Sequence, residues 1–112
     1  MEPTITLEKN ELPLEVKYDL GDELELTLPE YDCYLTDPNR LKYTVIRAFD
    51  RKASSIAKVD LEKKAIVIRE TNSELLGPND IILLVKDPES HAMNDQVAFR
   101  VEIEEPPKAN ND

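Results

Sequence analysis

Three stretches of this chain alternate strictly between apolar and polar residues, and this alternation constrains the fold more than any other feature. The clearest is QVAFRVEIE, residues 96–104. LPLEVKY (12–18) and ELELTL (23–28) follow the same two-residue period. Successive side chains of a β-strand point to opposite faces, so this period places every apolar residue on one face. We therefore expect three strands, each burying one face in a core.

Three further runs are more continuously apolar: LKYTVIRAF (41–49), KAIVIRE (64–70) and IILLVK (81–86). The last two are short and rich in Ile, Val and Leu, which is typical of central strands covered on both faces. The sequence SIAKVDLEKKAIVI predicts a hairpin with residues 60–64 as its connector. A short strand at residues 4–7 and the proline at position 13 belong at a sheet edge.

The connectors between these runs are rich in turn-forming residues: DLGDE (19–23), TDPNR (36–40), GPND (77–80) and DPESHAMND (87–95). No stretch has a helical period longer than two turns, although TNSELLGPND could hold one helical turn. About seven strands in about 100 residues indicate an all-β fold, an antiparallel two-sheet sandwich. We expect residues 1–105 to form this domain and residues 106–112 to be a polar tail or linker.

The charge and cysteine content narrow the range of partners. The chain carries 14 basic and 24 acidic residues, a formal net charge of -10. Nucleic acids and anionic membrane surfaces attract clustered Lys and Arg, so neither is an expected partner. Cys33 is the only cysteine, which excludes an internal disulfide and a Cys/His metal site. No run is long and apolar enough to insert into a bilayer.

Five features in order resemble a known family: GDELELTL, DPNRLKYTVI, AKVDLEKKAIVI, LLGPNDIILLVKDPE and VAFRVEIEEP. Together they resemble the cadherin-like immunoglobulin-type sandwiches, in particular the dystroglycan-type cadherin-like repeats and the bacterial immunoglobulin-like domains. The resemblance covers about residues 4–105. It implies an immunoglobulin/cadherin-like β-sandwich that serves adhesion or protein contact outside the cell or at its surface.

The same features leave calcium open as a ligand, with Asp37, Asn39 and Asp87 as the weak candidates. Calcium takes six to eight oxygen ligands, so residues from several loops would have to converge, and Asp22 or Glu23 could join them. The alternative is that Asp37 and Asp87, each followed by proline, begin turns and accept backbone N–H groups. We favour the turn interpretation and expect no other cofactor.

Other reactive or contact residues are few. His91 is the only histidine and has no evident nucleophile beside it, and Cys33 is expected to be a partly buried thiol. Tyr18 and Tyr43 lie in phase with apolar strand faces, so we expect both in the core. Tyr31 and Tyr34 do not, which makes them interaction candidates. The sequence therefore predicts a protein that is not an enzyme.

We expect a noncatalytic structural and protein-interaction module, one domain of a larger cell-surface or extracellular protein. Its rigid core would hold loops and edges in place for a protein partner. Two alternatives stay open: a calcium- or carbohydrate-binding sandwich domain, and a small docking subunit of an intracellular assembly.

Overall fold

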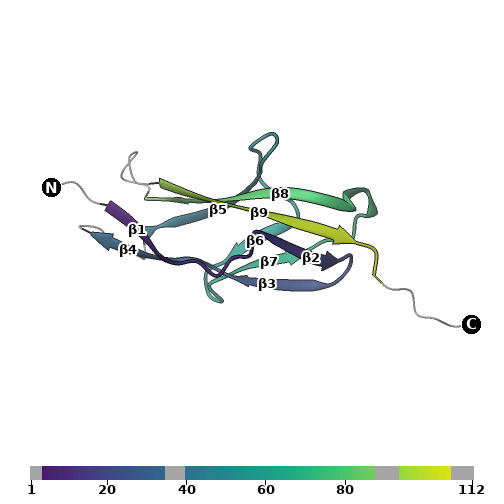
Figure 1. Ribbon diagram of the computed structural model, residues 1–112, viewed down its shortest axis with the longest axis horizontal. Helices are drawn as coiled ribbons and strands as arrows, with labels where there is room; N and C mark the ends of the chain where they lie inside the picture. Colours follow the sequence, from purple (N-terminus) through teal and green to yellow (C-terminus); the bar gives the residue numbers. More distant parts are fainter. Residues whose placement is uncertain (1–3, 35–39, 88–93, 107–112) are drawn as a thin grey trace, which may run out of the picture.

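The computed structural model describes residues 4–34, 40–87 and 94–106, and these residues form an all-β sandwich (Figure 1). A 3-10 turn, η2 (Ser73–Leu75), confirms the single helical turn expected within TNSELLGPND. The strands are β1 (Thr4–Lys9), β2 (Glu15–Asp19), β3 (Glu23–Thr27), β4 (Glu30–Tyr34), β5 (Lys42–Arg47), β6 (Ala57–Asp60), β7 (Ala65–Arg69), β8 (Gly77–Lys86) and β9 (Asn94–Glu104).

The strands are arranged in three hydrogen-bonded groups. One sheet has the order β2-β9-β8-β5, a second has the order β3-β7-β6, and β1 pairs with β4. All pairs are antiparallel except β2 with β9, which is parallel. The predicted antiparallel β-sandwich is therefore confirmed, and the parallel pair of β2 with β9 is a detail that the sequence did not indicate. The predicted β6–β7 hairpin is confirmed, and its connector is residues 61–64.

Breaks at two prolines explain why the sandwich has nine strands rather than about seven. Pro13 lies between β1 and β2, and Pro29 lies between β3 and β4. Proline lacks the N–H that a continuous ladder needs. After each break the chain continues in the same general direction but pairs with a different strand (Figure 1). If β1 and β2 are counted as one interrupted strand, and β3 and β4 as another, the sandwich has the expected seven strands.

The core lies between the two larger sheets. Its most deeply buried side chains come from β7, β8 and β9 and are Ile66, Ile68, Ile81, Leu83, Val85, Val101 and Ile103. Tyr18 is also buried, as expected, whereas Tyr43 is only partly buried against the core. Branched aliphatic residues suit this position because they pack well on a pleated surface.

Several expectations from the sequence need correction. Leu14 was expected on the buried face, but it lies before β2 begins and is 86% exposed. The strands β7 and β8 are central in their sheets, yet their outward residues Val67, Ile82 and Leu84 are only half-buried, so neither strand is covered on both faces.

Two segments predicted as connectors turn out to be strand. Residues 77–80 are the first part of β8, and residues 94 and 95 are the start of β9. The strand β4 has no counterpart among the predicted strands. At the other end of the domain β9 stops at Glu104, and the predicted tail from 107 onward lies outside the described residues.

Candidate functional site

Asp87 lies directly after β8 and is buried, with only 2% of its side chain exposed. Its Oδ1 is 3.4 Å from Nη2 of Arg40, whose side chain is 38% exposed. A buried carboxylate needs a partner of opposite charge, and Arg40 supplies it. From the sequence, Asp87 was interpreted as a turn residue or a calcium ligand. Neither interpretation included the ion pair with Arg40 that the structure shows.

The other calcium candidates do not gather around Asp87. Asp37 and Asn39 lie outside the described residues. Asp22 lies in the turn that joins β2 to β3, where the neighbouring Leu20 N–H donates to Glu104 at the end of β9. Asp87 follows Lys86, which pairs with Asn94 at the opposite end of β9.

A strand of this length spans roughly 30 Å, so Asp22 and Glu23 lie at the far end of the sandwich from Asp87. The expectation that either could join Asp87 is therefore wrong. In the described ranges, no group of three or more His, Cys, Asp or Glu side chains is placed to hold a metal ion.

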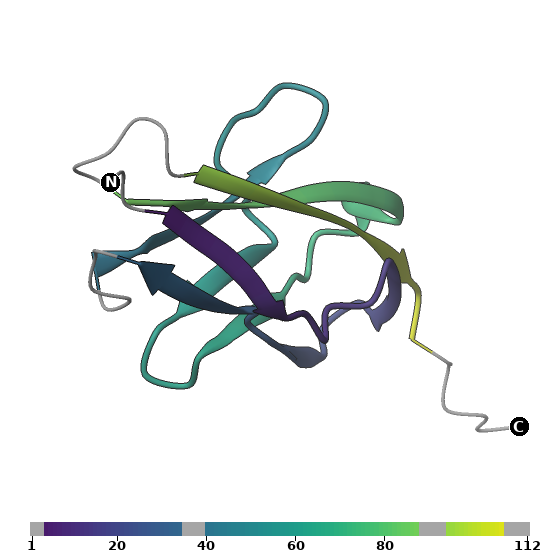
Figure 2. The same cartoon turned by 60° about the vertical axis from the view of Figure 1, so that its left-hand side comes forward.

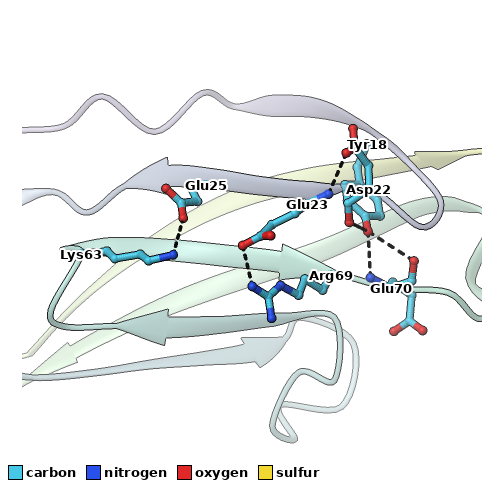
Figure 3. Close-up of polar contacts among 7 residues, drawn as sticks. All are labelled: Tyr18, Asp22, Glu23, Glu25, Lys63, Arg69 and Glu70. Carbon is cyan, nitrogen blue, oxygen red and sulfur yellow. Dashed lines mark hydrogen bonds and ion pairs between the residues drawn. The ribbon is translucent and has the colours of Figure 1, made fainter.

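Near Asp22, a network around the hydroxyl group of Tyr18 joins three parts of the chain (Figure 3). The hydroxyl donates to the carbonyl of Asp22 and accepts from the N–H of Glu70 at 2.8 Å. The Oδ1 atom of Asp22 accepts from the N–H of Glu23 at 2.9 Å. These contacts close the turn between β2 and β3 onto the end of β7, which is a structural role.

The outer face of the β3-β7-β6 sheet carries paired charges (Figure 3). Glu23 Oε1 lies 2.6 Å from Arg69 Nη2, and Glu25 Oε1 lies 2.8 Å from Lys63 Nζ. The hydrogen bond from Lys63 to Glu25 raises the pKa of Lys63 above its ordinary value. All four side chains are largely exposed, so this face is a solvated surface with compensated charge.

Tyr31 is half-buried on β4, and its hydroxyl donates to Oδ2 of Asp95 on β9 at 2.6 Å. Burial raises the pKa of Tyr31 above its ordinary value, and this hydrogen bond is the second largest cause of the rise. The nearby Cys33 is half-buried, as expected of the thiol. Tyr34 pairs through its backbone with Thr4, and its side chain lies outside the described set. Of the two tyrosines proposed as interaction residues, Tyr31 is held in place by its hydrogen bond to Asp95.

Phe49 is the aromatic residue that the sequence did not single out. It follows β5 in the connector to β6 and is 83% exposed. The guanidinium carbon of Arg47 lies 5.0 Å from its ring centroid, a cation–π distance. Beside it lies a groove of about 340 Å³ with Ile56, Leu75 and Pro78 in its lining, which we call the Phe49 groove.

A signal for this position was present in the sequence. Ile46 breaks the alternation of LKYTVIRAF, and DRKASS follows Phe49 as a polar run. The strand ends at Arg47, so Phe49 stands in a turn instead of continuing the buried face.

The fold and these surfaces define the chain as an all-β sandwich domain. No protein-family model matches it, and a search of curated proteins finds no significant relative. The resemblance to cadherin-like domains therefore stays a prediction. Across the residues that the structure describes, no helix is long and apolar enough to cross a membrane.

Proposed function

We propose that this chain is a noncatalytic structural and protein-interaction module, one domain of a larger cell-surface or extracellular protein. The observation that carries the proposal is Phe49, a large aromatic side chain that is 83% exposed in the turn after β5. Aromatic residues, phenylalanine among them, and arginine are enriched at the cores of protein interfaces. Phe49 and Arg47 together form such a pair on the surface.

The loop that carries Phe49 is held by several hydrogen bonds. The N–H of Arg47 donates to the carbonyl of Lys52 at 2.8 Å, and the N–H of Arg51 donates to the carbonyl of Arg47 at 2.9 Å. Asp50 pairs with Arg47 through two hydrogen bonds and accepts from the N–H of Lys52 at 3.1 Å. A loop ordered before binding loses little conformational entropy when a partner docks.

The proposed contact therefore combines an exposed apolar group with a fixed backbone, and the adjoining Phe49 groove gives a partner side chain a place to pack. In this proposal the module needs no cofactor. Its contribution is to present Phe49 and Arg47 in a constant geometry on the two-sheet core.

The test is affinity capture from the source cells with the wild-type chain, Phe49→Ser and Leu14→Ser. Leu14 is a matched control because it is 86% exposed and lies outside the Phe49 groove. We expect a protein that is captured by the wild type and by Leu14→Ser and is lost with Phe49→Ser. If no captured protein distinguishes the two variants, the proposal fails at this surface.

A further inference from the structure

The strand β4 has one unpaired edge in the described part of the chain. It pairs with β1 on one side, from Tyr34 opposite Thr4 to Glu30 opposite Lys9. The preceding strand, β3, pairs with β7, and this pairing ends where Thr27 lies opposite Ala65. No described strand continues it along the other side of β4. One further hydrogen bond extends the contact between β3 and β7: the N–H of Leu28 donates to the carbonyl of Lys64.

The reason for this ending is the β6–β7 hairpin. Residues 61–64 turn the chain from β6 into β7, so β7 starts only at Ala65 and does not run beside β4 (Figure 2). In an antiparallel pair, alternate residues direct their N–H and C=O groups away from the partner. The backbone of β4 therefore presents donors and acceptors on the side opposite β1, as an edge strand does.

A groove of about 770 Å³ lies at this edge, and we call it the β4 groove. One wall is the continuous segment 27–32, and Leu61 and Lys64 of the hairpin line it as well. The apolar and aromatic part of its lining consists of Leu28, Pro29, Tyr31, Leu41, Tyr43 and Leu61. Leu61 is 61% exposed, so an apolar residue stands open to solvent there.

The charges of the β4 groove indicate what kind of segment would fit. Its described lining contains the carboxylates of Glu8, Glu30 and Asp32 and one ammonium group, that of Lys64. All four residues are exposed. The chain as a whole is acidic, with a net charge of -10, so the field favours a cationic partner.

The side chains of β4 also set a pattern. Glu30 and Asp32 are exposed, whereas Tyr31 and Cys33 are half-buried and pack against the core. A strand added beside β4 would place alternate side chains next to the carboxylates and the others over Tyr31 and Tyr43, since cross-strand neighbours lie about 5 Å apart.

We propose that the unpaired edge of β4 binds an extended segment of a partner protein in which Lys or Arg alternates with aliphatic residues. The backbone of the segment completes the open ladder, its basic residues meet Glu30 and Asp32, and its aliphatic residues enter the β4 groove. This is strand addition, a mode in which main-chain hydrogen bonds supply affinity and side-chain pockets supply specificity.

The inference deepens the proposed interaction function and uses a different surface from Phe49. The probe is a capped peptide of about nine residues that alternates Lys and Val, long enough to form a strand. Its binding to the full chain is measured by fluorescence anisotropy. We expect Glu30→Lys/Asp32→Lys to weaken binding at least about tenfold.

Two protein controls distinguish binding at β4 from general charge attraction and from binding at the Phe49 surface. Glu15→Lys/Glu74→Lys makes the same change in net charge at exposed positions that do not line the β4 groove. Phe49→Ser tests the surface of the proposed function. Both should bind the peptide as the wild type does. Equal weakening by both charge variants, or loss with Phe49→Ser alone, would overturn the assignment to β4.

The backbone contribution is tested with N-methylated peptides, because a methyl group on an amide removes its donor. Methylation of every second amide in one phase should abolish binding, and methylation in the other phase should leave it unchanged. Equal binding by both peptides would mean simple charge attraction and would overturn strand addition. Self-association of the chain that Glu30→Lys/Asp32→Lys abolishes would identify a second copy as the occupant and overturn the partner-protein assignment.

Discussion

At the scale of single residues, Tyr18 shows how one polar group can hold the end of the sandwich. Its hydroxyl is the acceptor for the N–H of Glu70 and the donor to the carbonyl of Asp22. The residue is 3% exposed, so water cannot readily replace these partners. Loss of the hydroxyl would leave backbone groups of two connectors with unmet hydrogen bonds.

We therefore expect Tyr18→Phe to lower the free energy of unfolding by about 1 to 3 kcal/mol, the usual cost of an unsatisfied partner. Urea denaturation measures it. Tyr43→Phe is the matched control, since the hydroxyl of Tyr43 makes no hydrogen bond to a described residue, and it should have a much smaller effect. Equal losses in the two variants would contradict the role given to the Tyr18 hydroxyl.

Tyr31 should make the free energy of unfolding depend on pH in the alkaline range. Its folded pKa is raised by burial and by the hydrogen bond to Asp95, while in the unfolded chain it returns to about 10. Above that pH the unfolded state loses the proton and the folded state keeps it, so the free energy of unfolding falls as pH rises. Below about pH 9 the contribution is fully present.

Denaturation curves at about pH 8, 10 and 11 should therefore show a steeper loss of stability for the wild type than for Tyr31→Phe. The variant also lacks the hydrogen bond to Asp95, so it should start from a lower value at neutral pH. Parallel pH dependences for the two proteins would show that Tyr31 is not the group that titrates.

At the scale of elements, the connector between β5 and β6 contains a residue in a conformation that suits glycine. Arg51 has a φ of 57°, in the left-handed region that costs L-residues about 1 to 2 kcal/mol. We expect Arg51→Gly to stabilise the protein by up to about 1 kcal/mol, because relief of this cost outweighs the added freedom of the unfolded chain.

The neighbouring Lys52→Gly is the control, since Lys52 is not among the residues with positive φ. It should destabilise by about 0.5 to 1 kcal/mol, the entropic cost of glycine in an ordered position. Thermal unfolding of both variants gives the comparison. A loss of stability with Arg51→Gly would show that its side chain contributes more than its backbone costs.

At the scale of the whole molecule, the excess of acidic residues bears on the calcium hypothesis. A chain with a net charge of -10 repels itself, so added salt should raise the unfolding midpoint by screening. Calcium also contributes ionic strength. Its specific effect is therefore the difference between calcium chloride and sodium chloride at equal ionic strength.

We expect this difference to be close to zero, because Arg40 already meets the charge of Asp87. A bound ion at a hundred times its dissociation constant would add about 2.7 kcal/mol. Thermal unfolding in matched salts, with EDTA as the reference, measures the effect. A large calcium-specific shift that disappears in Asp87→Ala would establish a calcium site.

The sequence predicted the elements whose period is unbroken. The β6–β7 hairpin and the strands β3 and β9 follow directly from alternation and turn residues. It did not predict β4, since EYDCY looks polar even though Tyr31 and Cys33 share its inner side. The prediction for Leu14 was wrong for the opposite reason. The alternation around it is regular, but Leu14 precedes the first residue of β2, so its side chain is not held on the buried face.

Local periodicity was sufficient to determine the all-β class, because the direction of a side chain on a strand depends only on its neighbours. The pairing of charges and edges was decided by the tertiary structure. Arg40 meets Asp87 from 47 positions away, and the pairing of β3 with β7 does not continue along β4 because a distant hairpin turns at residues 61–64. Both features depend on residues far apart in the chain, and no local pattern records them.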